Sequence, residues 1–150
     1  MYSNWVANSL VMIATAATVA MAVLIHYEGL RAIGAFLPKI TSARRRKVLF
    51  GVYCVIVLHV VEIWLFGTTL WALLLVPGAG GIYGSSSGFL DAVYLSASTF
   101  STVGFGDLAP TGAVRFLAGT ESLTGFILIT WSASFLYLEM QEFWRRKPAA

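Results

Sequence analysis

The chain has 150 residues, of which 58% are hydrophobic and only 11% are charged. A soluble domain carries roughly 25% charged residues, so this composition excludes an ordinary soluble domain and indicates an integral membrane protein. The formal net charge is a modest +3, and we expect neither a nucleic-acid partner nor a cofactor. The single cysteine, Cys54, lies in an apolar run and cannot form a disulfide within one chain.

The first apolar span covers residues 6–25, which contain no charged residue. At about 1.5 Å per residue, its length matches the roughly 30 Å hydrocarbon core, so it predicts a transmembrane helix. No basic residue precedes it, and the residues after it, His26, Tyr27 and Glu28, make a poor cleavage site. We therefore expect a retained helix rather than a signal peptide, with these three residues as an interfacial anchor.

Residues 26–47 have mixed polarity and are interrupted by Gly29, Gly34 and Pro38. This pattern predicts a short amphipathic surface segment. It ends in a basic run of four residues, Arg44, Arg45, Arg46 and Lys47. Two roles stay open for this run: an anchor that sets the membrane topology, and a binding site for anionic lipid headgroups.

Three further segments complete the chain. Residues 48–76 form a second apolar span, and the glycine-rich stretch after Pro77 predicts a flexible loop. Residues 89–101 are apolar but too short to cross a membrane, whereas residues 113–140 form a third span. Non-helical backbone survives at membrane depth only where protein buries it or where it lines a wet cavity. The short segment therefore predicts a re-entrant helix followed by a loop.

The basic residues predict the orientation of the chain. Nine of the ten lie either in residues 26–47 or after the third span, and only Arg115 lies between the second and third spans. By the positive-inside rule, both basic segments are cytoplasmic, so the N-terminus and the loop over residues 77–112 are outside. The predicted fold class is an all-α membrane protein with three transmembrane helices and a re-entrant pore helix.

The sequence directly after the short helix carries the functional signal. Residues 102–107 read Thr-Val-Gly-Phe-Gly-Asp. This motif, behind the segment 89–101, resembles the selectivity filter of tetrameric potassium channels of the bacterial type, with two transmembrane helices and a pore loop. The resemblance covers residues 48–140, and the first helix is an addition to it. It implies a homotetramer in the plasma membrane, with bacterial members the nearest in pattern.

The resemblance implies passive conduction of K⁺ through a filter strand supplied by each of four chains. Rings of carbonyl oxygens replace the water shell of the ion. Gly104 and Gly106 allow the positive φ that aims successive carbonyls at one axis. Asp107 shapes the outer mouth. The residues that coordinate K⁺ are then Thr102, Val103, Gly104, Phe105 and Gly106.

The same resemblance divides the chain into two parts. Residues 1–47 hold the extra helix and a basic linker, and residues 48–145 hold the pore domain. The pore domain comprises an outer helix 48–76, a pore helix 89–101, a filter 102–107 and an inner helix 113–140. In the inner helix Gly125 matches the gating hinge of the family. Helical spacing then places a pore-lining stripe at Phe126, Ile129, Ala133 and Tyr137.

This sequence departs from the family pattern at several positions. Phe105 stands where tyrosine is commoner, so the hydroxyl that braces the filter is missing and aromatic packing must replace it. Ser98 stands where some members carry a carboxylate that pairs with the filter aspartate, which leaves Asp107 without that partner. The first span lacks the regular arginines of a voltage sensor, and we expect no regulatory domain after the inner helix.

Two alternatives remain for the function of the protein: a weakly selective cation channel and a non-conducting, channel-like regulatory subunit.

Ionisable residues inside the spans are candidates for a further role. His59 and Glu62 are three residues apart and share a helix face, and Glu121 lies on the third span. They predict a hydrogen-bonded cluster behind the filter, with a proton sensor or a metal site as the sharper hypotheses. No nucleophile or complete ligand set accompanies them, so we do not expect an enzyme.

Overall fold

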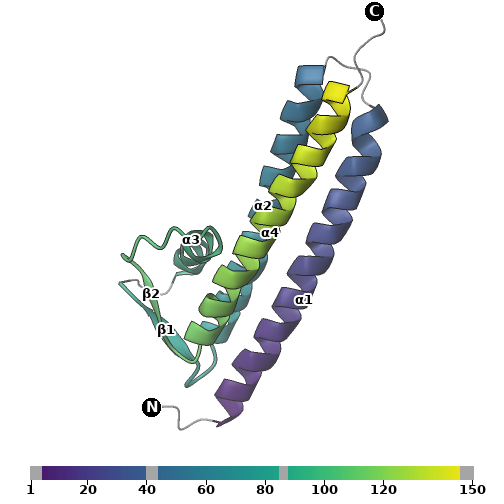
Figure 1. The fold of residues 1–150 in the computed structure, drawn as a ribbon. Coiled ribbons are helices and arrows are strands. Elements are labelled where there is room, and N and C mark those ends of the chain that lie inside the picture. The colour runs from purple at the N-terminus through teal and green to yellow at the C-terminus, as the bar shows by residue number, and fades with distance from the viewer. Residues whose placement is uncertain (1–4, 40–43, 85–87, 146–150) are drawn as a thin grey trace, which may run out of the picture.

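The computed structural model describes residues 5–39, 44–84 and 88–145 of the chain. Its main elements are three long helices that alternate in direction: α1 (Trp5–Phe36), α2 (Arg44–Leu74) and α4 (Arg115–Arg145) (Figure 1). Each contains a stretch long and apolar enough to cross a membrane. The all-α membrane fold predicted from the sequence is confirmed.

A short helix and a two-stranded sheet lie beside one end of the long helices. Helix α3 (Phe89–Phe100) lies against the bundle and is seen end-on in Figure 1, with strands β1 (Gly80–Tyr83) and β2 (Ala109–Gly112) beside it. Helix α1 begins at this same end, and α4 ends at the opposite one. The element that is too short to cross the membrane is therefore a separate helix, as the re-entrant pattern predicts.

Helix α1 is longer than its predicted span of residues 6–25. It continues to Phe36, followed by a 3₁₀ turn, η1 (Leu37–Lys39), so the amphipathic surface segment expected over residues 26–47 is wrong. Its glycines are points of close approach: a Cβ on Gly29 would lie 2.7 Å from Leu58 Cδ1. Its buried residues recur every three or four positions, as one helical stripe requires: Ala7, Val11, Thr15, Thr18, Ala22, His26, Leu30 and Ile33.

The other predicted boundaries shift by a few residues. Helix α2 starts at Arg44, so the basic run forms its first turn instead of a linker, and it ends at Leu74. Helix α4 begins at Arg115 and continues to Arg145, beyond the predicted end at residue 140. Helix ends differ by one or two residues between definitions, but these extensions are longer than that. The last basic residues, Arg146 and Lys147, lie outside the described residues.

The loop over residues 77–112 is more ordered than its glycines predict. Strands β1 and β2 pair antiparallel, with Gly80 opposite Gly112 and Tyr83 opposite Ala109. Gly80 has φ 132°, and a Cβ there would collide with the carbonyl of Thr111. The glycine therefore permits a tight strand pair. This pair ties together the two ends of the segment that contains α3 and the filter motif.

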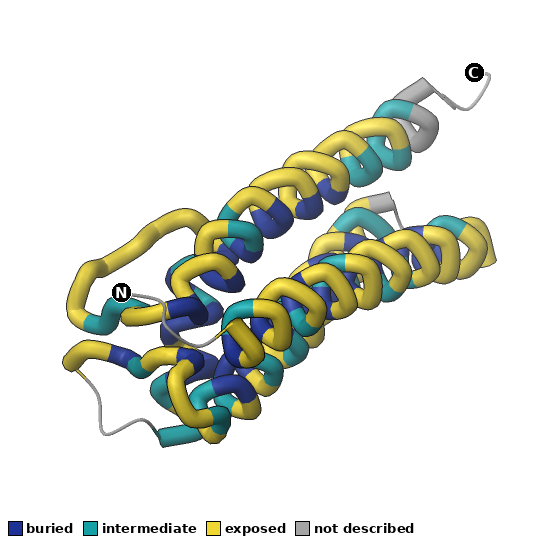
Figure 2. Tube along the Cα trace, turned by 90° about the horizontal axis from the view of Figure 1, so that it is seen from below, coloured by how far each residue is buried: buried dark blue, intermediate teal, exposed yellow. Residues whose placement is uncertain are grey.

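Helix α3 packs between α2 and α4, where two glycines let it approach their backbones. A Cβ on Gly67 would lie 2.8 Å from Val93 Cα, and a Cβ on Gly125 would collide with the Phe100 carbonyl. Phe100 is the last residue of α3 and is 1% exposed. Figure 2 shows the buried positions along the inward faces of the elements.

Two hydrophobic clusters hold the helices together. The larger lies around α3 and includes Phe66, Leu70, Phe100, Leu117 and Leu128. The smaller joins α1 and η1 to α2 and consists of Leu30, Ile33, Leu37, Val55 and Leu58. The bundle is thus packed along its length, and α1 belongs to the fold of the single chain.

The contact between Gly125 and α3 predicts a matched pair of variants. Gly125→Ala forces the new methyl group against the Phe100 carbonyl and should cost about 1–3 kcal/mol of stability, as overpacking does. Gly119→Ala in the same helix meets nothing within 4 Å and should be neutral or slightly stabilising. Thermal unfolding of the detergent-solubilised protein measures both, and equal melting temperatures would contradict the packing role.

Candidate functional site

The backbone after α3 has a regular alternation of conformation. Thr102, Gly104 and Gly106 have φ of 60°, 54° and 83°. Among the described residues, Thr102 is the one non-glycine residue with positive φ. The Gly104 amide donates a 3.1 Å hydrogen bond to the Ser98 carbonyl, which joins this strand to the last turn of α3. Positive φ at every second residue is strained for threonine and allowed for glycine, and it turns successive carbonyls toward one side of the strand.

The same strand is exposed along its length in a single chain. All residues from 101 to 107 are exposed, with Val103 at 57% and Phe105 at 70%. A Cβ on Gly104 or Gly106 would meet no atom within 4 Å. The glycines at these positions are therefore required by backbone conformation and not by crowding within the chain.

Tyr94 on α3 supports the strand from one side. Its hydroxyl donates a 2.9 Å hydrogen bond to Asp107 Oδ2. Its ring stacks on Phe105, with centroids 6.4 Å apart and planes 5° apart. As expected, position 98 gives Asp107 no partner, since the Ser98 hydroxyl donates to the Leu95 carbonyl. Tyr94 is a partner that this expectation did not include.

Sequence reasoning missed Tyr94. The signal that could have found it was an aromatic hydroxyl on the predicted pore helix, close to a filter that lacks its own tyrosine. The aromatic packing expected for Phe105 is present, and Tyr94 supplies both the ring and the hydroxyl.

Glu121 on α4 lies against α3 and is not bonded to His59 or Glu62 of the second span. It is 1% exposed and is hydrogen-bonded through Oε1 to the hydroxyl of Ser96. The Ser96 oxygen also lies 2.8 Å from the Ile63 carbonyl of α2. Ser96 therefore links three helices, and the predicted cluster of His59, Glu62 and Glu121 is divided into two sites.

The second of these sites includes His26, which the sequence predicted to lie in an interfacial anchor. Glu62 Oε1 lies 2.8 Å from His26 Nδ1, and Glu62 Oε2 lies 2.9 Å from His59 Nδ1. His26 is fully buried, so its predicted role in an interfacial anchor is wrong. Tyr27 is exposed, and Glu28 forms an exposed ion pair with Arg31 at 2.6 Å.

The predicted pore-lining stripe is exposed in the single chain. Phe126 is 57% exposed and Tyr137 is 54% exposed, on the side of α4 that faces away from α2 and α3. Gly125 is buried against Phe100 within an uninterrupted helix, so packing accounts for this glycine; its role as a hinge stays a prediction. The stripe consists of Phe126, Ile129, Ala133 and Tyr137.

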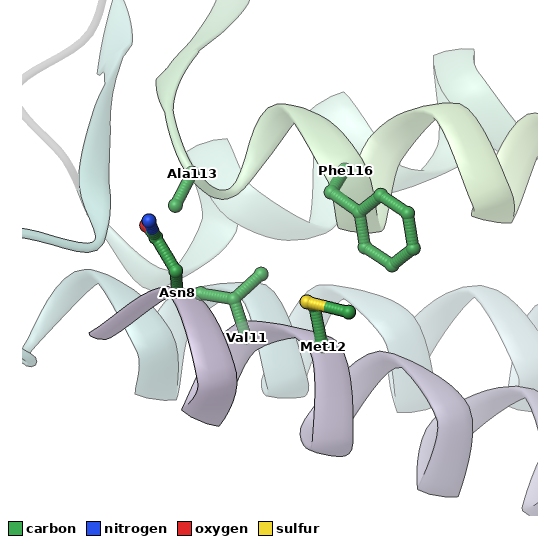
Figure 3. Close-up of a pocket in the computed structure, with 5 residues that line it drawn as sticks. All are labelled: Asn8, Val11, Met12, Ala113 and Phe116. Atoms are coloured by element: carbon green, nitrogen blue, oxygen red, sulfur yellow. The ribbon is translucent and has the colours of Figure 1, made fainter. Parts of the chain in front are cut away.

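A separate cavity of about 290 Å³ lies between α1 and α4 (Figure 3). Asn8, Val11 and Met12 line it from α1, Ala113 lines it from the turn before α4, and Phe116 lines it from the first turn of α4. Asn8 supplies the one hydrogen-bonding side chain of the five. This cavity therefore holds no catalytic or metal-binding set.

Comparison with known proteins identifies the class of molecule. A family model described as an ion channel matches residues 47–142, more than half of the chain. Protein LctB of Bacillus caldotenax and Protein LctB of Geobacillus stearothermophilus are each 45% identical to the chain over 38 residues. These matches cover 25% of this chain and 28% of each relative, so the chain spans just over a quarter of the curated relatives' length. No solved structure matches it significantly.

The bond between Tyr94 and Asp107 predicts a dependence of stability on alkaline pH. Donation to Asp107 requires the phenol proton, so it raises the pKa of Tyr94 above the usual value of about 10. The bond therefore stabilises the fold fully at pH values below the usual pKa of tyrosine. Its contribution to stability is lost as the pH rises through the raised pKa. Tyr94→Phe should lower the melting temperature at neutral pH, and the difference from wild type should vanish at high pH. Tyr83→Phe, on exposed β1, should give no such difference; a Tyr94→Phe deficit that persists unchanged at high pH would contradict the assignment.

The three-helix contact at Ser96 predicts which substitution is tolerated. Ser96 has one hydroxyl proton and two oxygen atoms within reach, on Ile63 and on Glu121. The Ser96 hydroxyl is the donor in both contacts, shared between the Ile63 carbonyl and Glu121 Oε1. Glu121→Gln keeps an acceptor oxygen for Ser96 and should change stability little, whereas Ser96→Ala should cost about 1–3 kcal/mol because it leaves a buried carboxyl without this donor. Equal losses in thermal unfolding would refute this arrangement.

Proposed function

This chain belongs to the ion-channel family whose model spans residues 47–142, and from that premise we propose that four copies form a potassium-selective channel that conducts K⁺ passively. The observation that supports this most is the positive φ at Thr102, Gly104 and Gly106. The protein then catalyses no reaction, and K⁺ is the permeant ligand and not a cofactor.

The alternating backbone explains how a dehydrated cation is coordinated. When every second residue has positive φ, the carbonyls of successive residues all point toward one axis. In a regular β-strand they would point to alternating sides. Four such strands around that axis offer stacked rings of oxygen atoms to K⁺. The carbonyls of Thr102, Val103, Gly104 and Phe105 form these rings, and the hydroxyl of Thr102 adds the innermost one.

The exposure of the filter strand supports assembly from several copies. In a single chain residues 101–107 are all exposed, although Tyr94 contacts Phe105 and Asp107 from one side. Uncovered irregular backbone is not stable at membrane depth. One chain also supplies one strand, which cannot enclose an ion. A homotetramer solves both problems: neighbouring chains cover the outer side, and the carbonyls face a hydrated axis.

Helix α3 and the exposed stripe of α4 fit this arrangement. The C-terminal end of α3 leads directly into the filter, so the negative end of its dipole lies next to the cation path. The exposed stripe from Phe126 to Tyr137 then lines the cavity and inner mouth below the filter. Asp107, held by Tyr94, lies at the outer mouth.

The proposed orientation places the filter end outside and the end of α4 in the cytoplasm. Arg45 and Arg46, both exposed in the first turn of α2, then lie at the cytoplasmic surface. With their neighbours they attract anionic lipid headgroups, at about 1 kcal/mol per basic residue near the surface. The full basic set is Arg44, Arg45, Arg46 and Lys47.

The test is the reversal potential of the purified protein in planar bilayers with K⁺ on one side and Na⁺ on the other. We expect a value near the potassium equilibrium potential. Gly104→Ala should abolish the selective current, because it places a side chain at φ 54°. Gly119→Ala is the matched control: both glycines have open space around them, and only Gly104 requires positive φ.

Two other outcomes correspond to the alternatives. A reversal potential near zero would identify a weakly selective cation channel, which the absence of a hydroxyl on Phe105 favours. No current in the tetrameric, folded protein under varied pH, voltage and lipid composition would support a non-conducting regulatory subunit.

A further inference from the structure

Helices α1 and α2 bring two histidines and a carboxylate together away from the filter. The ligand atoms of His26, His59 and Glu62 all lie within 4.8 Å of one another. Each histidine directs Nδ1 to a different carboxylate oxygen of Glu62, at 2.8 Å and 2.9 Å. The two imidazole rings are stacked, with centroids 5.5 Å apart. The three donor groups therefore converge on one small volume.

This group is largely closed to solvent. The side chains of His26 and Glu62 are 0% exposed, and that of His59 is 16% exposed. Glu62 lies within a stretch of α2 that is apolar enough to cross a membrane. A carboxylate buried there carries a large desolvation cost unless a cation accompanies it. The cation can be a proton on a histidine or a bound metal ion.

The number and type of donors favour the metal ion. One protonated histidine would neutralise Glu62, so charge balance by a proton does not require the second histidine. Two imidazole nitrogens and a carboxylate are instead the donor set of a three-residue zinc site, which keeps a fourth position for water. Ligands around a four-coordinate zinc lie about 3.3 Å apart, so the observed N–O separations need to open only slightly.

A contact from the third long helix orients one of these ligands. Ser132 Oγ on α4 lies 3.4 Å from His26 Nε2, the nitrogen that does not face Glu62. Histidines that ligate a metal through one nitrogen ordinarily have the other held by such a partner. We propose that His26, His59 and Glu62 bind one divalent transition-metal ion of the zinc type, with Ser132 as a positioning residue.

A bound ion would have a structural consequence. The side chain of His59 is 16% exposed, so the site is not fully closed in the single chain. The ring of His59 also lies 5.8 Å from that of Phe100, at the end of α3. A bound ion therefore joins α1 to α2 beside the helix that leads into the filter. Metal binding at this site does not depend on ion conduction and is tested without it.

The experiment is a zinc titration of the full-length protein in detergent micelles after treatment with a chelator. We expect one Zn²⁺ per chain by calorimetry and by elemental analysis, with a higher melting temperature when the ion is bound. His59→Gln keeps a hydrogen-bond donor toward Glu62 but removes the imidazole; it should weaken zinc binding by tenfold or more while the metal-free protein stays folded. Glu62→Gln should do the same. Ser132→Ala should weaken binding by about 10- to 100-fold.

The controls separate a built metal site from adventitious zinc binding and from a cluster that holds only a proton. Glu28→Gln removes an exposed carboxylate from the same helix as His26 and should leave zinc affinity unchanged. Co²⁺ in place of Zn²⁺ should give the strong visible absorption of a tetrahedral ion, and His59→Gln should abolish it. Equal zinc affinity in wild type and His59→Gln, or no binding to wild type, would overturn the proposal. A melting temperature that depends on pH through the histidine range and not on zinc would do so too, and would identify a proton-holding cluster.

Discussion

The structure depends on one constraint: residues 101–107 are irregular backbone within a chain that otherwise crosses the membrane as helices. Helices satisfy their own backbone groups, whereas this strand leaves carbonyls and amides that need other partners. Thr102 takes up a positive φ in addition to the glycines, although threonine is strained there. Such strain persists only where the surroundings impose it.

The surroundings that impose this conformation converge on α3. Glycines at Gly67 and Gly125 let α2 and α4 approach it closely, and Ser96 joins it by hydrogen bonds to both. The pairing of β1 with β2 closes the loop that carries it, and Tyr94 holds Asp107 at the far end of the filter. Helices α2 and α4 are therefore both in packed contact with the helix that leads into residues 101–107.

The first helix belongs to the same packed unit. It contributes to both hydrophobic clusters, and His26 brings its polar contact to Glu62 of α2. Within a membrane, association of helices relies on close packing of small residues and on such interhelical hydrogen bonds, because lipid is as apolar as the side chains. Gly29 against Leu58 is the corresponding packing contact. A helix that is additional to the family pattern is thus integrated by polar and steric complementarity.

The sequence by itself determined the three spans, the short helix and the positive φ of Gly104 and Gly106, because these depend on local properties: the length of apolar runs and the conformational freedom of glycine. It did not determine that α1 continues past residue 25 or that β1 pairs with β2. It also did not determine that His26 joins Glu62 across 36 residues, or that Glu121 meets Ser96 and Tyr94 meets Asp107. Only the tertiary structure decided these contacts, since they depend on how each helix is rotated about its axis and where it crosses its neighbours. Lipid-facing and buried positions are equally apolar in a membrane helix, so hydropathy alone does not reveal which face is turned inward.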